Sequence, residues 1–441
     1  MPQFWKIIGG ADKGGIIVRD GESVKSNRFY DRLSTGALCE EKELRGDRLH
    51  YAKLQGSGPV EGWISVKLPS GTCTFVDISG QSVIGKELAV RTSEAGEIIK
   101  VQVPALSTLP ESPSLPVPNG VGPHREEALP IGIFFPGQGS QYVKMMQSVK
   151  DLPAVKRMLE VSRDILGYDI LDICLNGPEE KLEETRYCQP ALFIGGLAGL
   201  EKLRSEKKEA VTRASVMAGL SLGEYTALCA AGAMSFEDGL KLVKLRGEAM
   251  QEAATMGTKK QLMLSVAGLD KKKLESLCQE AAQKEGPGAV CSIANCLFPN
   301  GFSLGGTEQA MMNLKDLAEA NGALSAKVLK TAGAFHTSLM QPAQDKLTAA
   351  LEATLPNMKP PMHTVWMNAS AQPIRPGSDP VEIVALLKKQ LTNPVLWVDS
   401  VQAILKEGVT EFYEAGPMKQ IKAMMKRIDQ QAWKNTTNVE V

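Results

Sequence analysis

The chain has 441 residues, 43% of them hydrophobic, which is enough for two or three domains with full cores. Its 50 basic and 50 acidic residues give a formal net charge of zero, so no overall field attracts nucleic acid or an anionic membrane. No run of eighteen apolar residues occurs, and the first six residues, MPQFWK, lack the basic and apolar regions of a signal peptide. We therefore expect a soluble protein with no nucleic-acid partner and no membrane insertion, either cytosolic or already processed for an organelle.

Eight cysteines are present, and they form no C-x-x-C pair and no His-rich ligand spacing. Several lie inside apolar helical runs, which indicates reduced, buried thiols. We expect no metal site.

Residues 1–103 are rich in glycine and divide into short β-like runs separated by turn signals. The pattern predicts a small antiparallel barrel of the SH3-like type. Seven prolines then fall between Pro104 and Pro130, which predicts a semi-extended linker over 104–129. The predicted strands of the barrel are Phe4–Ile8, Gly15–Val18, Leu49–Leu54, Gly62–Leu68 and Thr72–Ile78.

From residue 130 onward strands alternate with helices, which is typical of an α/β fold. This pattern covers 130–255 and resumes over 330–441. Between the two parts, residues 256–329 read strand, helix, strand, strand, helix, strand, which is the order of a ferredoxin-like fold. The sequence therefore predicts a large α/β subdomain with a small inserted subdomain.

The β-like run Ile131–Phe135 ends in a glycine-rich turn, PGQGSQ. Two glycines beside a strand end let backbone N–H groups approach a bound group, as an oxyanion donor must. The alternative is an ordinary glycine-rich turn.

Ser221 lies between glycines in Gly219–Gly223 (GLSLG), where an apolar run changes into an alanine-rich helical stretch. This pattern predicts a nucleophile elbow, a sharp strand-to-helix turn that holds the serine in a strained conformation at a helix N-terminus. A plain tight turn fits the same residues, so other segments of the chain must distinguish the two alternatives.

A serine nucleophile needs a base, and the chain has only four histidines. His50 belongs to the predicted barrel and His124 to the linker. His336 follows a strand end at a glycine-rich turn, as active-site residues of α/β folds usually do. We therefore favour His336 as the base and expect the polar atoms of His363 to be satisfied by the backbone.

Arg246 falls on the apolar stripe of the predicted helix Phe236–Ala254, which Ser235 caps. A buried guanidinium must meet an anion or remain an unpaired buried charge. Either an internal salt bridge or an anionic substrate satisfies this requirement.

Three segments together resemble the malonyl-CoA:acyl-carrier-protein transacylases of fatty-acid synthesis in order and spacing: FPGQGSQ, GLSLGEY and Gly333–Met340 (GAFHTSLM). The resemblance runs from about Leu129 to about Asp429 and does not include residues 1–103. It implies an α/β-hydrolase-like large subdomain that carries a ferredoxin-like small one, with the active site between them.

The resemblance also implies roles for individual residues. Ser221 would be the nucleophile and His336 the base, with the imidazole oriented by the backbone carbonyl of Gln390. The backbone N–H groups of Gln138 and Leu222 would bind the oxyanion.

Three further residues are implied to bind substrate. Arg246 would pair with the malonyl carboxylate, which suits the two-bond geometry of a guanidinium. Phe335 would leave no room for an α-methyl group, and Gln189 would be a further polar residue near the site.

The chain departs from the family pattern at three places, one of which is the segment after Gly257, which reads TKKQ where relatives tend to be small and apolar. Leu220 precedes the nucleophile where many relatives have histidine, a form that plastid-type members share. Met418 stands where a glycine is usual.

We therefore expect a monomeric ping-pong acyltransferase that moves a malonyl group from malonyl-CoA to an acyl carrier protein, with no cofactor, in the plastid stroma or the cytosol. A serine esterase or thioesterase and a non-catalytic scaffold are the alternatives. Because carrier proteins of this type are acidic, a basic helix face is the candidate docking surface, although a solvated helix face fits it as well. It comprises Lys419, Lys422, Lys426 and Arg427.

Overall fold

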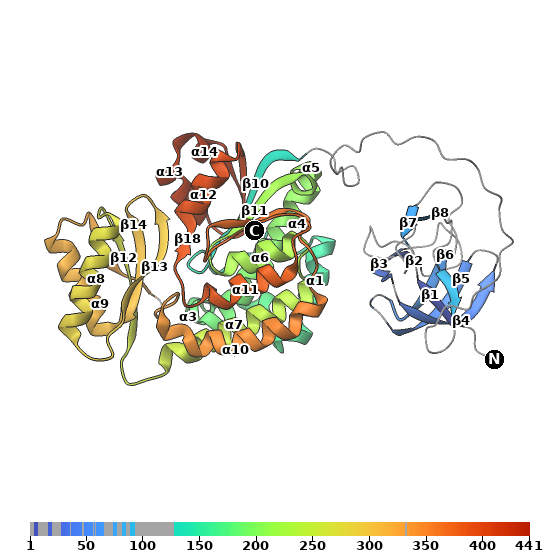
Figure 1. Ribbon diagram of the computed structural model, residues 1–441, viewed down its shortest axis with the longest axis horizontal. Helices are drawn as coiled ribbons and strands as arrows, with labels where there is room; N and C mark the ends of the chain where they lie inside the picture. Colours follow the sequence, from blue (N-terminus) through green and yellow to red (C-terminus); the bar gives the residue numbers. More distant parts are fainter. Residues whose placement is uncertain are drawn as a thin grey trace. The chain divides into compact units, whose positions relative to one another are not determined.

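The chain forms two compact units, Met1–Pro118 and Asn119–Val441. Both are seen in a computed structural model (Figure 1). Nearly all of the predicted linker and His124 lie outside the residues that the structure describes. The described residues are 4–7, 16–19, 28–35, 37–45, 48–55, 57, 59–65, 74–76, 82–84, 89–92, 128–330 and 333–441.

The first unit contains a seven-stranded antiparallel sheet in the order β3-β2-β6-β5-β4-β1-β9 and a separate antiparallel pair, β7 and β8. The antiparallel sheet expected here is confirmed. Its buried side chains include Ile7, Val18, Leu33 and Tyr51. The strands are β1 (Phe4–Ile7), β2 (Ile16–Arg19), β3 (Arg28–Leu33), β4 (Leu38–Arg45), β5 (Arg48–Gln55), β6 (Glu61–Ser65), β7 (Thr74–Val76), β8 (Ser82–Ile84) and β9 (Ala89–Thr92).

The second unit is built on a six-stranded sheet in the order β17-β16-β11-β10-β19-β20. Only the edge strand β17 runs antiparallel to its neighbour. The mixed α/β fold expected from the sequence is confirmed. The strands are β10 (Leu129–Phe135), β11 (Ala214–Gly219), β16 (Thr364–Met367), β17 (Gln372–Ile374), β19 (Glu411–Ala415) and β20 (Thr436–Val439).

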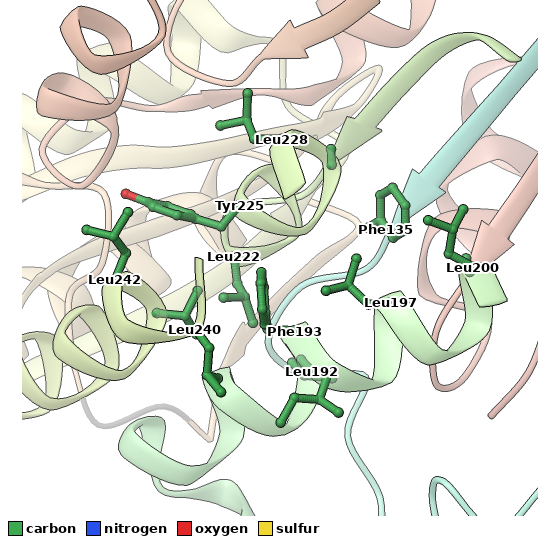
Figure 2. Packing of buried hydrophobic residues seen from close by; sticks show 14 of the residues in the cluster. Phe135, Leu192, Phe193, Leu197, Leu200, Leu222, Tyr225, Leu228, Leu240 and Leu242 are labelled. Atoms are coloured by element: carbon green, nitrogen blue, oxygen red, sulfur yellow. The ribbon is translucent and has the colours of Figure 1, made fainter. Parts of the chain in front are cut away.

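Helices cover both faces of this sheet. Alternate side chains of β10 pack on the two faces of the sheet, because successive side chains of a strand point in opposite directions. Phe134 packs with Trp397 and Phe412 in a cluster that α12, α13 and α14 complete. Phe135 belongs to the larger cluster on the other face, with leucines of α4, α6 and α7 (Figure 2).

Helix α4 is buried along most of its length and lies close to its neighbours because it carries glycines. A Cβ on Gly199 would lie 2.8 Å from the backbone nitrogen of Gly416, so only glycine allows this approach. The helices of the large sheet are α1 (Pro153–Leu166), α2 (Ile170–Asn176), α3 (Glu179–Glu183), α4 (Thr185–Glu206), α5 (Lys208–Thr212), α6 (Leu222–Ala230), α7 (Phe236–Thr255), α10 (Gln341–Thr354), α11 (Pro380–Gln390), α12 (Trp397–Lys406), α13 (Gln420–Ile428) and α14 (Gln430–Lys434).

Between α7 and α10 the chain forms a second sheet in the order β15-β12-β14-β13, with antiparallel neighbours, and α8 and α9 pack beside each other against it (Figure 1). A short strand from after α11, β18, joins its edge in parallel to β13. The elements are β12 (Gln261–Ala267), α8 (Lys271–Glu285), β13 (Cys291–Phe298), β14 (Gly301–Thr307), α9 (Glu308–Ala320), β15 (Ser325–Val328) and β18 (Val395–Leu396).

None of the helices in the described ranges is long and apolar enough to cross a membrane.

Candidate active site

Ser221 occupies the turn between β11 and α6, with φ at 53° and ψ at −99°. Its flanking glycines are required by contact distances. A Cβ on Gly219 would lie 1.9 Å from the carbonyl carbon of Gly223, and one on Gly223 would lie 2.2 Å from the oxygen of Phe135. The strand-to-helix turn therefore closes only with glycine on both sides of the serine.

Asn368, the residue after β16, holds this turn in place. Its Oδ1 accepts the N–H of Ser221 at 2.7 Å, and its Nδ2 donates to the carbonyl of Gly219 at 2.8 Å. Sequence reasoning did not single out Asn368. Its signal is a polar residue directly after a buried strand, at the sheet edge where strand ends converge.

The structure brings Ser221, His336 and Gln390 together in one chain of contacts. Oγ of Ser221 lies 2.7 Å from Nε2 of His336, and Nδ1 of His336 lies 2.8 Å from the carbonyl oxygen of Gln390. A neutral imidazole with its proton on Nδ1 donates to that carbonyl and accepts from the serine hydroxyl. The carbonyl takes the place that a carboxylate holds in a Ser-His-Asp triad.

The surroundings keep this imidazole neutral. His336 is buried, and burial together with the positive charge of Arg246 lowers its pKa to about 4. At neutral pH its Nε2 is therefore unprotonated and free to accept the hydrogen bond of the serine hydroxyl.

Arg246 of α7 is fully buried and points at the same place. Nη1 donates to Oε1 of Gln189 at 2.8 Å, and Nη2 donates to Oγ of Ser221 at 3.0 Å and to Oε1 of Gln390 at 2.9 Å. The guanidinium carbon lies 5.4 Å from the centre of the Tyr225 ring. Within the described chain, neutral groups receive its hydrogen bonds, so an internal salt bridge does not explain its burial.

Glu224 is the buried carboxylate nearest to this network. It accepts hydrogen bonds from Nε2 of Gln390 and from the backbone N–H of Asn368, the latter at 2.7 Å. Burial raises its pKa to about 7 despite these bonds and the charge of Arg246. Through Gln390 and Asn368, Glu224 is tied to both members of the serine–histidine pair.

The glycine-rich loop after β10 uses most of its N–H groups internally. The N–H of Gly137 donates to Gln420, that of Gly139 to Gln141 at 2.8 Å, and that of Ser140 to the Gly137 carbonyl at 3.3 Å. In the part of the chain that is described, the N–H of Gln138 has no such partner. Leu222 is the first residue of α6, where a helix N–H has no carbonyl one turn before it.

A cleft of about 480 Å³ opens over the serine–histidine pair, between the glycine-rich loop and the second sheet. Four of the expected site residues line it: Gln138, Ser221, Phe335 and His336. The other four, Gln189, Leu222, Arg246 and Gln390, lie outside its lining and are buried. Met418 also lines the cleft, with a positive φ of 62°.

His363 lies apart from this site, as expected. Its Nδ1 is 2.8 Å from the carbonyl oxygen of Ala214, at the start of β11. The described residues contain no group of three or more His, Cys, Asp or Glu side chains that could hold a metal ion.

This geometry defines a serine acyltransferase class of site, and residues 133–440 match the acyl transferase domain family. The human mitochondrial malonyl-CoA–acyl carrier protein transacylase is 38% identical over 319 residues, covering 70% of this chain and 80% of that protein. The chain belongs to the malonyl-CoA–acyl carrier protein transacylase family.

Two solved structures support this assignment. The transacylase of Coxiella burnetii has a TM-score of 0.65 and 32% identity, covering 71% of this chain and 94% of its own. A malonyl-transacylase in complex with a type II polyketide-synthase acyl carrier protein has a TM-score of 0.63 and 32% identity, covering 70% and 94%.

Proposed function

We propose that this protein is an acyl-carrier-protein S-malonyltransferase of fatty-acid or polyketide synthesis. It moves the malonyl group of malonyl-CoA to the phosphopantetheine thiol of an acyl carrier protein. One observation carries the proposal: the guanidinium of Arg246 contacts the hydroxyl of Ser221, and its hydrogen bonds all go to neutral groups. A fixed cation beside a paired serine and histidine suits an acyl group that ends in a carboxylate.

In the first half-reaction, Oγ of Ser221 attacks the thioester carbon while Nε2 of His336 takes the hydroxyl proton. The oxyanion accepts hydrogen bonds from the backbone N–H groups of Gln138 and Leu222. The carbon–sulfur bond then breaks, and the imidazolium returns the proton to the coenzyme A thiolate.

In the second half-reaction, His336 takes the proton of the carrier thiol, and the sulfur attacks the malonyl ester on Ser221. The ester carbon–oxygen bond breaks, and the proton returns to Oγ. The same imidazole thus acts as base and as acid in each half.

Arg246 binds the malonyl carboxylate through its two Nη groups. Its hydrogen bonds to Gln189 and Gln390 fix the plane of the guanidinium before substrate arrives. The ring of Phe335, which lines the cleft, limits space beside the α-carbon and disfavours a branched acyl group.

The carrier protein docks on the basic face of α13. Lys419, Lys426 and Arg427 are exposed, and α13 follows directly after Met418 at the cleft. Lys422 is half-buried and donates to the carbonyl of Thr436, so it contributes least. Charge reversal at Lys426 should weaken transfer to the carrier without changing acylation by malonyl-CoA.

The finer architecture follows the same family. Residues 256–329 form a ferredoxin-like small subdomain, an interpretation that the strand order β15-β12-β14-β13 supports. It is inserted in an α/β-hydrolase-like large subdomain over 130–255 and 330–441. The antiparallel strands described in the first unit support the SH3-like barrel predicted for residues 1–103, whereas the linker predicted for 104–129 lies almost wholly outside the described residues.

The enzyme works where malonyl-CoA and a carrier protein are both present, in the plastid stroma or in the cytosol. The name of the human relative adds the mitochondrion as a third compartment to examine. Microscopy of a fluorescent fusion in the source cell distinguishes the three.

Intact-mass analysis after incubation with malonyl-CoA tests the function. The wild type should gain one malonyl group and release one equivalent of coenzyme A, and Ser221→Ala should gain nothing. Sustained release of coenzyme A without a thiol acceptor would indicate a thioesterase, and no adduct at all would favour the scaffold.

A further inference from the structure

Gln420, the first residue of α13, holds the glycine-rich loop with both ends of its side-chain amide. Its Oε1 accepts the N–H of Gly137 at 2.9 Å, and its Nε2 donates to the carbonyl of Gln138 at 3.1 Å. These two backbone groups flank the peptide that joins Gly137 to Gln138. One hydrogen bond on each side of this peptide restricts its rotation about the chain direction.

The clamped peptide is the one that carries the N–H of Gln138. Its rotation decides where that N–H points, and Gln138 and Ser221 line the same cleft. The loop has little room to move toward the elbow, because a Cβ on Gly137 would lie 2.5 Å from the carbonyl oxygen of Leu220. The carbonyl of the same peptide accepts the N–H and the hydroxyl of Ser140 at 3.3 and 2.8 Å, so Gln420 and Ser140 together restrict its rotation.

Gln420 is itself held firmly at the start of α13. The carboxylate of Glu414 accepts the N–H groups of Ile421 and Lys422 at 2.8 and 2.9 Å, so it caps the helix. Because Glu414 satisfies these two N–H groups, the side-chain amide of Gln420 is free to hydrogen-bond to the glycine-rich loop. The turn before it has a positive φ at Met418, a conformation that non-glycine residues seldom adopt.

We propose that Gln420 is a positioning residue that aims the N–H of Gln138 at the oxyanion of both half-reactions. The inference rests on the proposed function, because it assigns the oxyanion to this N–H. Gln420 itself does not touch the reacting atoms. It acts by fixing a donor before charge develops, which is how preorganised donors lower a barrier.

Gln420→Leu removes both bonds while keeping an apolar stem. Loss of a whole oxyanion donor lowers kcat by about 10²–10³, so a donor that is present and misaimed should cost about 10- to 100-fold. The KM for malonyl-CoA should stay within about twofold, because the interaction is made in the transition state. Gln420→Glu should not restore the rate, since it keeps the acceptor for Gly137 and sets a second oxygen against the Gln138 carbonyl.

The chain offers a matched control in Gln430, the first residue of α14. It is exposed, and its Nε2 also donates to a backbone carbonyl, that of Lys426 at 2.8 Å. Gln430→Leu should therefore match the wild type in kcat. The thermal midpoint of each variant shows whether it folds.

Isotope-edited infrared spectroscopy of the enzyme acylated with carbonyl-¹³C malonyl-CoA measures the stretching frequency of the ester carbonyl. A loss of stability alone would not change this frequency. A well-aimed donor lowers the ester carbonyl stretching frequency, so the band should rise in Gln420→Leu and stay in place in Gln430→Leu. A lower kcat with an unmoved band, or an unchanged kcat, overturns the inference. Failure of the wild type to form an acyl-enzyme would instead overturn the proposed function.

Discussion

A buried histidine lies beside each end of strand β11, and the two histidines differ in the residues that surround them. Both imidazoles bond through Nδ1 to a backbone carbonyl at 2.8 Å, His336 to Gln390 and His363 to Ala214. At the carboxyl end, the other ring nitrogen of His336 meets Ser221. Burial and a backbone bond are therefore common to both, and the serine sets the carboxyl end apart.

The carboxyl end also gathers buried polar groups from separate elements: Arg246 of α7, Glu224 of α6, Gln390 of α11 and Asn368 after β16. Each costs free energy to bury, and their mutual hydrogen bonds offset that cost. The site at this sheet is therefore defined by the segments that converge on it, and not by a buried histidine alone.

Replacing the two histidines is the strongest test of this contrast. His336→Ala should slow both half-reactions by about 10²–10⁴, the usual contribution of general acid–base catalysis. His363→Ala removes a buried ring at the amino end and should affect the thermal midpoint more than the rate. Single-turnover release of coenzyme A measures the first half-reaction, and differential scanning fluorimetry measures the stability.

If His363→Ala proves the more damaging to the rate of acylation, the base has been assigned to the wrong end of the strand.

Arg246 gives the next largest effect. A charge-assisted pair with a carboxylate contributes roughly 1.5–3 kcal/mol, so Arg246→Ala should lower malonyl transfer by about ten- to a hundredfold or more. Acetyl transfer needs no counter-charge and should survive or rise. The ratio of kcat/KM for malonyl-CoA and acetyl-CoA measures the change, and equal damage to both substrates would make the arginine structural.

The dependence of acylation on pH should be weaker than for an ordinary histidine. Because the pKa of His336 is lowered to about 4, kcat/KM should show no loss near pH 6.5 from this group and should fall only as the pH approaches 4. Arg246→Ala removes one of the two causes of the lowered pKa, so its acid limb should move to higher pH. An acid limb near pH 6.5 in the wild type would contradict this account.

The pH dependence of the free energy of unfolding follows from the same pKa. Since the unfolded imidazole takes up a proton near pH 6.5 and the folded one near pH 4, this group makes stability fall as the pH drops between those values. The full loss is about 3 kcal/mol. Glu224 titrates in the opposite sense, because its raised pKa favours the folded state at low pH. The difference between wild type and His336→Gln in urea unfolding, measured at pH 7 and pH 4.5, isolates the histidine.

Local patterns were enough to predict part of the site. Gly219 is required by contacts with Gly223 and Glu224, within five residues, and Arg246 could be placed inward because the 3.6-residue period sets its helix face. Gly223 is required instead by the oxygen of Phe135, which is distant in sequence. The carbonyl of Gln390 was expected from the family resemblance alone. Asn368 and Gln420 act across 147 and 283 residues of sequence. The position of Asn368 directly after a buried strand is a local signal, but it does not identify Ser221 as the partner, and no local pattern marks Gln420.

Strands were predicted where apolar residues alternate and were missed where charge dominates. β4 reads LCEEKELR, with two fully buried residues at its start and exposed or half-buried ones after them, so its pattern resembles a loop. β18 has two residues, and only its pairing with β13 makes it a strand. The predicted helix Phe236–Ala254 matches α7 to within one residue because Ser235 caps its start.

The smallest effect is expected from removing the first unit. The described part of the second unit enters that sheet at Leu129, the first residue of β10, six residues before the loop that carries Gln138. Near this entry, Ala128 and His363 line a cavity of about 210 Å³ that does not include Ser221 or His336. The family match begins at residue 133, within β10. Deleting residues 1–118 should therefore leave malonyl transfer to a free carrier protein within about twofold, because a separately folded unit adds no group to the site. Intact-mass and steady-state assays of the truncated chain check this, with His363→Ala in the same background as the control for damage at the amino end. A truncated protein that folds and yet forms no malonyl adduct would show that the first unit is needed at the carboxyl end of β11, and the site could no longer be explained by the segments that converge there.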